Sequence, residues 1–124
     1  MRFVIATLFW ALSCAPSLAH ELTPTYFKLT PSIYDNVDRT TMMMFNRRSD
    51  INYYQIEVYD AEWNSVPFAT SERMMQLKYL ERKSFEIYVK AKDAERVTYI
   101  CTRSKILKGG ESSVIASNIC SKIK

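Results

Sequence analysis

The stretches Val97-Thr-Tyr-Ile-Cys-Thr-Arg-Ser-Lys-Ile106 and Val114-Ile-Ala-Ser-Asn-Ile-Cys-Ser-Lys-Ile-Lys124 are typical of two strands, and they flank the only two glycines of the chain. A tight turn centred on Gly110-Glu111 would place Cys101 directly opposite Cys120. Opposed side chains of an antiparallel pair come within bonding distance of each other. We therefore expect a C-terminal hairpin closed by a disulfide between these two cysteines.

The amino-terminal residues have the pattern of a secretory signal. Arg2 is followed by the apolar and small stretch Phe3–Leu12, and Ser17-Leu18-Ala19 ends in the small residue that signal peptidases require. The apolar run is too short to span a bilayer as a helix. We expect residues 1–19 to be a signal peptide that is cleaved after Ala19.

The third cysteine fits this interpretation. Cys14 would leave with the signal, so the mature chain would keep an even pair of cysteines, as expected of a periplasmic or secreted protein. The alternative is that Cys14 becomes a lipid-modified cysteine after Ala11-Leu12-Ser13.

Removing residues 1–19 leaves a chain of the size of one compact domain, residues 20–124. The net charge of the full chain is +4, and the basic residues are interleaved with acidic ones. This pattern indicates a solvated surface rather than a nucleic-acid footprint, which would need a basic stripe. The sequence contains no repeat or long linker. We expect one domain that binds no nucleic acid.

Apolar residues alternate with polar ones along several short runs, which is the period of half-buried strands. The runs are Tyr53–Asp60, Met75–Tyr79 and Phe85–Val89. Thr41–Phe45 is apolar on both faces, as expected of a central strand. Turn residues separate the runs, and only residues 91–96 suggest a helical turn. The predicted fold is all-β, a sandwich of two antiparallel sheets with about seven strands.

The sequence offers little for catalysis. The chain has one histidine, no nucleophile elbow and no phosphate-binding glycine loop. After cleavage, His20 would be the first residue, and a terminal amine with its imidazole can chelate copper. Such sites need a second histidine, which this chain lacks. We therefore expect neither an enzyme nor a cofactor or metal, with His20 as the only conceivable copper ligand.

The remaining option is protein binding, and the last strand is the candidate. The expected hairpin puts Ile115, Ser117 and Ile119 on one face, with Ile123 further along. A strand of this kind offers main-chain hydrogen bonds and a row of side chains to an incomplete partner sheet. The alternative is an ordinary final strand whose isoleucines are buried in the core of its own domain.

Several segments, in this order, resemble a known family. They are Leu22-Thr-Pro-Thr25, an apolar strand that ends in Phe45-Asn46, Tyr54-Gln-Ile-Glu-Val-Tyr59, Met75–Val89 and Ile119–Lys124. Together they resemble the N-terminal domain of the PapD-like periplasmic chaperones, which assemble fimbriae and pili. The second domain of that family is absent from this sequence.

The resemblance implies an immunoglobulin-like domain whose last strand is donated to a pilus subunit that lacks one. It maps the donated side chains onto Ile115, Ser117 and Ile119, and it maps the lysine that anchors the carboxylate of the subunit onto Lys124. Tyr26 lies near the position of the usual arginine partner, with Lys28 two residues on. The alternative function is a structural or accessory immunoglobulin-like module of a surface or virion assembly.

Overall fold

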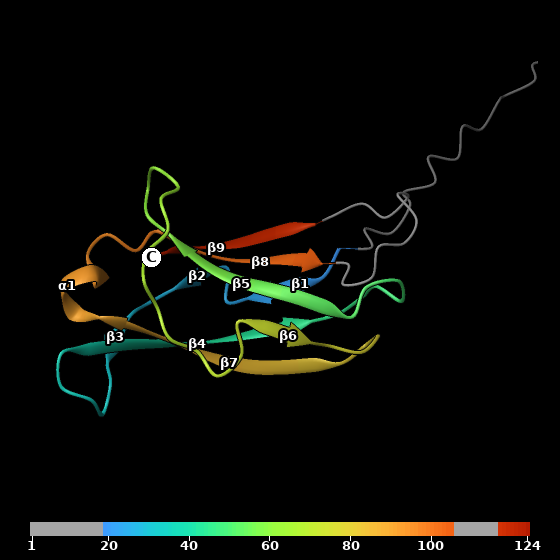
Figure 1. The fold of residues 1–124 in the computed structure, drawn as a ribbon, viewed down its shortest axis with the longest axis horizontal. Helices are drawn as coiled ribbons and strands as arrows, with labels where there is room; N and C mark the ends of the chain where they lie inside the picture. The colour runs from blue at the N-terminus through green and yellow to red at the C-terminus, as the bar shows by residue number, and fades with distance from the viewer. Residues whose placement is uncertain (1–18, 106–116) are drawn as a thin grey trace, which may run out of the picture.

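The structure is a computed structural model that describes residues 19–105 and 117–124. Two β-sheets face each other as the layers of a sandwich (Figure 1). The strands are β1 (Glu21–Thr23), β2 (Tyr26–Phe27), β3 (Thr30–Pro31), β4 (Val37–Phe45), β5 (Tyr53–Tyr59), β6 (Met74–Gln76), β7 (Arg82–Lys90), β8 (Tyr99–Lys105) and β9 (Asn118–Ile123). One helical turn, α1 (Ala91–Ala94), follows β7. The predicted signal peptide before residue 19, the glycine turn and Ile115 lie outside the described residues.

The order of the strands confirms the predicted fold class. In the first sheet β4 lies between β1 and β3 on one side and β7 on the other. The second sheet has the order β2-β9-β8-β5-β6. The pairing of β4 with β7, opposite a sheet built on β5, β8 and β9, is the arrangement of an immunoglobulin-like sandwich. The described residues form nine strand segments rather than about seven, because the N-terminal region is divided into short pieces.

The N-terminal strand changes sheets at Pro24. Before it, β1 pairs with β4 in the first sheet, and after it, β2 pairs with β9 in the second. The peptide bond between Thr23 and Pro24 is cis. The β2–β9 pair is parallel, so the second sheet is not purely antiparallel as predicted. Two hydrogen bonds join β9 to this crossing point, from Ser121 Oγ to the Pro24 carbonyl oxygen at 2.6 Å and from the Lys122 N–H to the Thr25 carbonyl oxygen at 3.0 Å.

Alternating residues of the long strands fill the space between the sheets. Tyr54, Ile56 and Val58 of β5 are at most 1% exposed, as their period-two pattern predicts. On β4 the pattern corrects the sequence-based expectation that both faces are buried. Met42 and Met44 point inward and are buried, whereas Met43 points outward and is 36% exposed. The strand is central within its sheet, but the outer face of that sheet is open to solvent.

The C-terminal hairpin has the predicted register. Cys101 pairs with Cys120, and their Cα atoms lie 4.0 Å apart across a disulfide bond. Main-chain hydrogen bonds join Ser104 to Ser117 at one end of the ladder and Thr98 to Ile123 at the other. Because hydrogen-bonded and non-hydrogen-bonded pairs alternate along an antiparallel ladder, the cysteines occupy a non-hydrogen-bonded position, where side chains approach most closely.

We expect the disulfide to contribute a large part of the stability of the domain. It closes a loop between residues separated by 19 positions, and such a loop corresponds to about 3 kcal/mol in the chain-entropy model. The double variant Cys101→Ser, Cys120→Ser should therefore melt roughly 10 to 20 °C below the oxidised parent in calorimetry. A reducing agent should lower the melting temperature of the parent and leave that of the variant unchanged. Equal melting temperatures for the oxidised parent and the variant would contradict this assignment.

Candidate functional site

The outer edge of β9 is the part of the molecule that bears on the predicted strand addition. Residues 117, 119, 121 and 123 direct their main-chain groups toward β8, as the bonds at both ends of the ladder show. Asn118 and Cys120 therefore direct their N–H and C=O groups to the opposite side. Among residues 19–105 and 117–124, β2 is the only strand that pairs with β9 on that side, at Lys122 and Ile123, and β1 runs close to β9 without pairing with it. The main-chain edge at Asn118 and Cys120 is not paired with a strand of the described chain.

The isoleucines of the predicted donor row lie on the inner side of the strand. Ile119 and Ile123 are half-buried and pack against the hydrophobic core. Ser117 shares this face and contacts His20, while Ile115 lies outside the described residues. On the outer side, Asn118 is exposed and Cys120 forms the disulfide. The outer edge of β9 therefore offers chiefly main-chain groups.

The two lysines that the resemblance singles out lie close to each other. Lys28 and Lys124 line the same open cavity of about 370 Å³, and the Lys124 N–H donates a hydrogen bond of 2.9 Å to the Phe27 carbonyl oxygen. The carboxylates of Asp38 and Glu95 line this cavity as well. Tyr26, near the expected arginine position, pairs with Lys122. The end of β9 thus carries positive charge that acidic residues partly balance.

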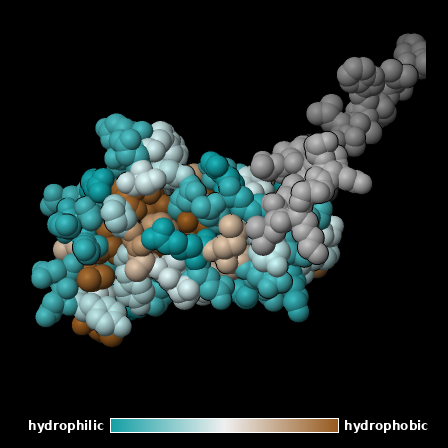
Figure 2. Space-filling view, viewed as in Figure 1, coloured by the Kyte–Doolittle hydropathy of each residue, from teal (hydrophilic) through white to brown (hydrophobic). Residues whose placement is uncertain are grey.

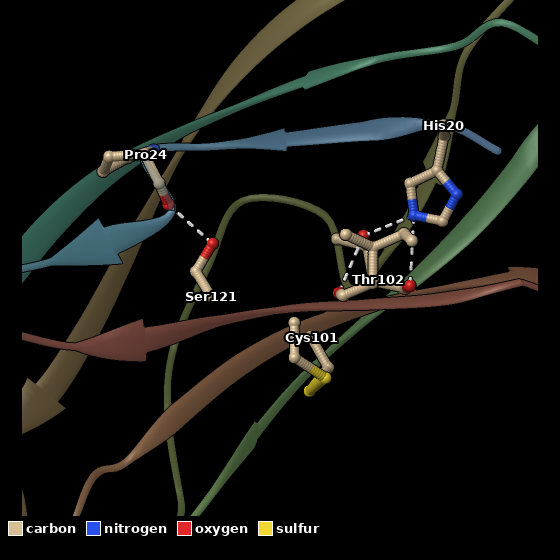
Figure 3. Close-up of a disulfide and its surroundings, with 7 residues drawn as sticks. His20, Pro24, Cys101, Thr102 and Ser121 are labelled. Carbon is tan, nitrogen blue, oxygen red and sulfur yellow. Dashed lines mark hydrogen bonds between the residues drawn. A yellow bond between two sulfur atoms is a disulfide. The ribbon is translucent and has the colours of Figure 1, made fainter. Parts of the chain in front are cut away.

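His20 is a buried structural residue and not an exposed ligand. It is 2% exposed, and its ring packs on Tyr54 with a centroid distance of 4.5 Å. Its Nε2 lies 2.6 Å from Thr102 Oγ1 and donates to the Thr102 carbonyl oxygen at 3.1 Å. Figure 3 draws His20 and Thr102 with the bonds between them. The other nitrogen, Nδ1, then accepts from Ser117 Oγ at 3.0 Å. Both ring nitrogens are occupied by this network, which leaves neither for the copper site considered above.

The pKa of His20 is lowered from 6.5 to about 4, chiefly by burial; the hydrogen bond to the Thr102 carbonyl opposes this shift, and the nearby Arg48 guanidinium contributes to it. The imidazole is therefore neutral at physiological pH and holds the start of β1 against β8 and Ser117. Figure 3 also shows that the disulfide lies on the other side of β8 from His20. The hairpin is thus fixed from the inside by His20 and from the outside by the cysteines.

A second buried polar group, Asn46, holds the connection between β4 and β5. Its Nδ2 donates to the carbonyl oxygens of Ile51 at 2.8 Å and Leu77 at 3.0 Å. Its Oδ1 accepts from the Arg48 N–H at 2.9 Å and from the Tyr54 hydroxyl. Burial raises the pKa of Tyr54 to about 12, so this hydroxyl remains a donor. In the sequence, Asn46 was noted only as part of the family resemblance. Its buried role could have been inferred from its place as a lone polar residue at the end of an apolar strand.

A different part of the surface carries an apolar hollow. Figure 2 shows apolar residues gathered in the half of the visible face that lies farthest from the grey segments. A hollow of about 270 Å³ is formed where the segment after β5 meets β7. Its lining residues are Val37, Pro67, Phe68, Ala69, Tyr88 and Lys90. None of them belongs to β9 or to its neighbours in the second sheet, so this hollow is separate from the strand edge.

Comparison with protein-family models, with curated proteins and with solved structures finds no match for this chain. No helix within residues 19–105 and 117–124 is long and apolar enough to cross a membrane. The same residues contain no group of three or more histidine, cysteine or acidic side chains arranged to hold a metal ion.

The inward orientation of Ile119 can be tested by substitution. We expect Ile119→Asp to destabilise the domain by roughly 2 to 4 kcal/mol, because it buries a carboxylate against apolar side chains. The neighbouring change Asn118→Asp places the same group on the exposed side and should alter the free energy of unfolding by less than about 0.5 kcal/mol. Urea unfolding of the two variants measures both values, and equal effects would show that the assigned faces are wrong.

The lowered pKa of His20 predicts a loss of stability in acid. Because the unfolded chain takes up this proton near pH 6.5 and the folded chain only near pH 4, the stability is complete above pH 6.5 and falls as the pH drops to 4. The total loss is on the order of 2 to 3 kcal/mol. Urea unfolding between pH 7 and 4.5 should show this fall in the parent and a flatter profile in His20→Gln.

The acidic groups titrate in a lower range and can be separated from this effect. Hydrogen bonds from Asn64 hold the pKa of Asp60 below its usual value of 3.8, so its contribution is lost only below that pH. Identical slopes for the parent and His20→Gln above pH 4.5 would contradict the assignment to His20.

Proposed function

We propose that this protein is an exported, chaperone-like binding protein that captures a partner protein by strand addition to the outer edge of β9. The observation that carries the proposal is the pair of outward main-chain positions at Asn118 and Cys120, which β2 leaves uncovered. Unpaired strand edges bind extended segments through main-chain hydrogen bonds. The partner strand would lie beside β9 until it meets β2 at Lys122.

The disulfide supports this function because it keeps the edge extended. Cys101 and Cys120 fix the middle of β9 to β8, and β8 is itself paired with β5 along its whole length. A strand that is already ordered loses less conformational entropy when a partner binds. The same bond is consistent with the periplasmic or secreted location that the predicted signal peptide indicates.

The PapD-like resemblance suggests the class of partner. It implies a pilus or surface-fibre subunit whose own sheet lacks a strand, and a lysine near the end of the donated strand that binds the subunit's C-terminal carboxylate. The resemblance maps this lysine onto Lys124, and Lys28 lines the same cavity as Lys124. The edge geometry supports strand addition, and the resemblance suggests the class of protein that would supply the added strand.

A second candidate is a structural or accessory immunoglobulin-like module that has no strand to donate. The packing of Ile119 and Ile123 against the core favours it, because β9 completes the sandwich of its own domain. The two candidates differ in one respect that can be measured. A chaperone-like binder needs the outward main-chain groups of β9, whereas a structural module does not.

We expect Asn118→Pro to abolish partner capture and to preserve the fold. Proline removes an N–H that points away from β8, so the β8–β9 ladder and the disulfide remain intact. The matched control is Met74→Pro, which removes an outward N–H from β6 at the other edge of the same sheet. Oxidised parent and variants would be co-purified from the periplasm of the source organism, and bound proteins would be identified by mass spectrometry.

Hydrogen exchange supplies the second measurement. In the complex, the amides of Asn118 and Cys120 should become protected, while those of Ile119 and Ser121 are protected already in the free protein because they pair with β8. Capture that survives Asn118→Pro, with no change in the exchange of these two amides, would refute strand addition and favour the structural module.

A further inference from the structure

Four strands of the second sheet place a row of aromatic and basic side chains across its outer face. Tyr59 of β5 pairs with Tyr99 of β8, Tyr99 pairs with Lys122 of β9, and Lys122 pairs with Tyr26 of β2. Directly paired residues share a face, and the buried neighbours of these residues show that the face is the outer one. Three steps between strands span about 14 Å. The row therefore has the length of a small oligomeric ligand.

Trp63, in the loop after β5, lies on top of this row. Its ring is stacked on that of Tyr99, with centroids 4.1 Å apart and planes inclined by 3°, and it meets Tyr59 at 5.7 Å. Trp63 is nevertheless 52% exposed, and Tyr26 at the other end of the row is 62% exposed. Exposed aromatic side chains that gather in one row, unlike singly scattered ones, are typical of an interaction site.

The turn that carries Trp63 is built to hold the indole in place. Asp60 accepts hydrogen bonds from the main-chain N–H groups of Glu62 at 3.0 Å and Asn64 at 2.8 Å, and the Trp63 N–H donates to the Asp60 carbonyl oxygen at 3.1 Å. Trp63 itself has φ 64°, in the left-handed region. In a three-residue hairpin loop this position normally holds glycine. A bulky side chain kept in a costly conformation indicates a role outside folding.

We propose that the row formed by Tyr26, Tyr59, Trp63, Tyr99 and Lys122 is a binding site for an acidic saccharide. The flat, exposed indole suits the apolar C–H face of a pyranose ring, and tyrosine hydroxyls at the ring edges suit its hydroxyl groups. Lys122 lies between Tyr99 and Tyr26 and makes no ion pair within residues 19–105 and 117–124. Its charge is available for the carboxylate of a uronic or sialic acid.

A proline-rich peptide is the other ligand that aromatic rows commonly bind, and the geometry disfavours it. Such peptides insert into grooves between aromatic rings. Here Trp63 stacks on Tyr99 and lies near Tyr59, so one face of the Tyr99 ring is already occupied by the indole and is not open to a proline ring. This site lies on the face of the sheet and not on its edge, so it does not depend on strand addition through Asn118 and Cys120.

Fluorescence titration of the full chain carrying Trp10→Phe tests the proposal, because Trp63 is then the only tryptophan. The probes are trigalacturonate, an alginate trisaccharide and sialyllactose, with maltotriose as the neutral control. We expect saturable quenching or shift of the Trp63 emission by at least one acidic probe. Lys122→Met should weaken that binding about tenfold and leave any binding of maltotriose unchanged.

Trp63→Gly should abolish binding in calorimetric titration and change the melting temperature by less than about 3 °C, because glycine accepts the left-handed conformation. Tyr34→Ala, which removes an exposed tyrosine outside this row, should bind as the parent does. The proposal is overturned if no acidic probe saturates, if Lys122→Met has no effect on their affinity, or if a decaproline peptide binds in their place.

Discussion

The pairing of β8 with β9 is the constraint on which the rest of the molecule depends. It positions the final strand at the edge of the second sheet, and the disulfide between Cys101 and Cys120 fixes it there. It brings Ser117 and Ser121 to the inner side, where they bond to His20 and to the Pro24 carbonyl oxygen. The N-terminal strand is thereby attached to the C-terminal one, and the two ends of the domain stabilise each other.

The change of sheet at Pro24 determines how much of the last strand pairs with β2. Because β2 joins the second sheet only at Tyr26, it covers β9 from Lys122 onward and leaves Asn118 and Cys120 uncovered. An N-terminal strand that followed β9 along its full length would have closed this edge. The division of the strand also leaves Tyr26 on the outer face, at the end of the aromatic row. Both proposed sites thus depend on the same local feature.

The sequence was sufficient for the parts of the fold that are set by local pattern. The spacing of Cys101 and Cys120 around the glycines predicted the register of the hairpin, and alternation predicted the buried residues of β5 and β7. Alternation shows which residues share a face but not which face is inward. The strand-donation hypothesis assigned Ile119 to the contact with a partner protein, whereas the structure packs it against the core. Ser117, in the same row, is hydrogen-bonded to His20.

Other features depend on contacts between distant segments, which a single sequence does not reveal. The burial of His20 requires Thr102 and Ser117, 82 and 97 positions away. The stacking of Trp63 on Tyr99 likewise joins two segments that are distant in the sequence. One is the loop after β5, and the other is β8, which pairs with β5. Nothing in the sequence singled out Trp63, because it lies among turn residues, where only a polar loop is expected.

The sulfur bridge lies on the solvent side of the sheet, and Cys101, although buried, is not a member of the hydrophobic cluster. The disulfide therefore links the two strands without filling space in the core. Breaking a cross-link of this kind raises the conformational entropy of the unfolded chain, but it creates no cavity among the packed side chains. Removing the bond should consequently lower the melting temperature and leave the packing of the interior unchanged.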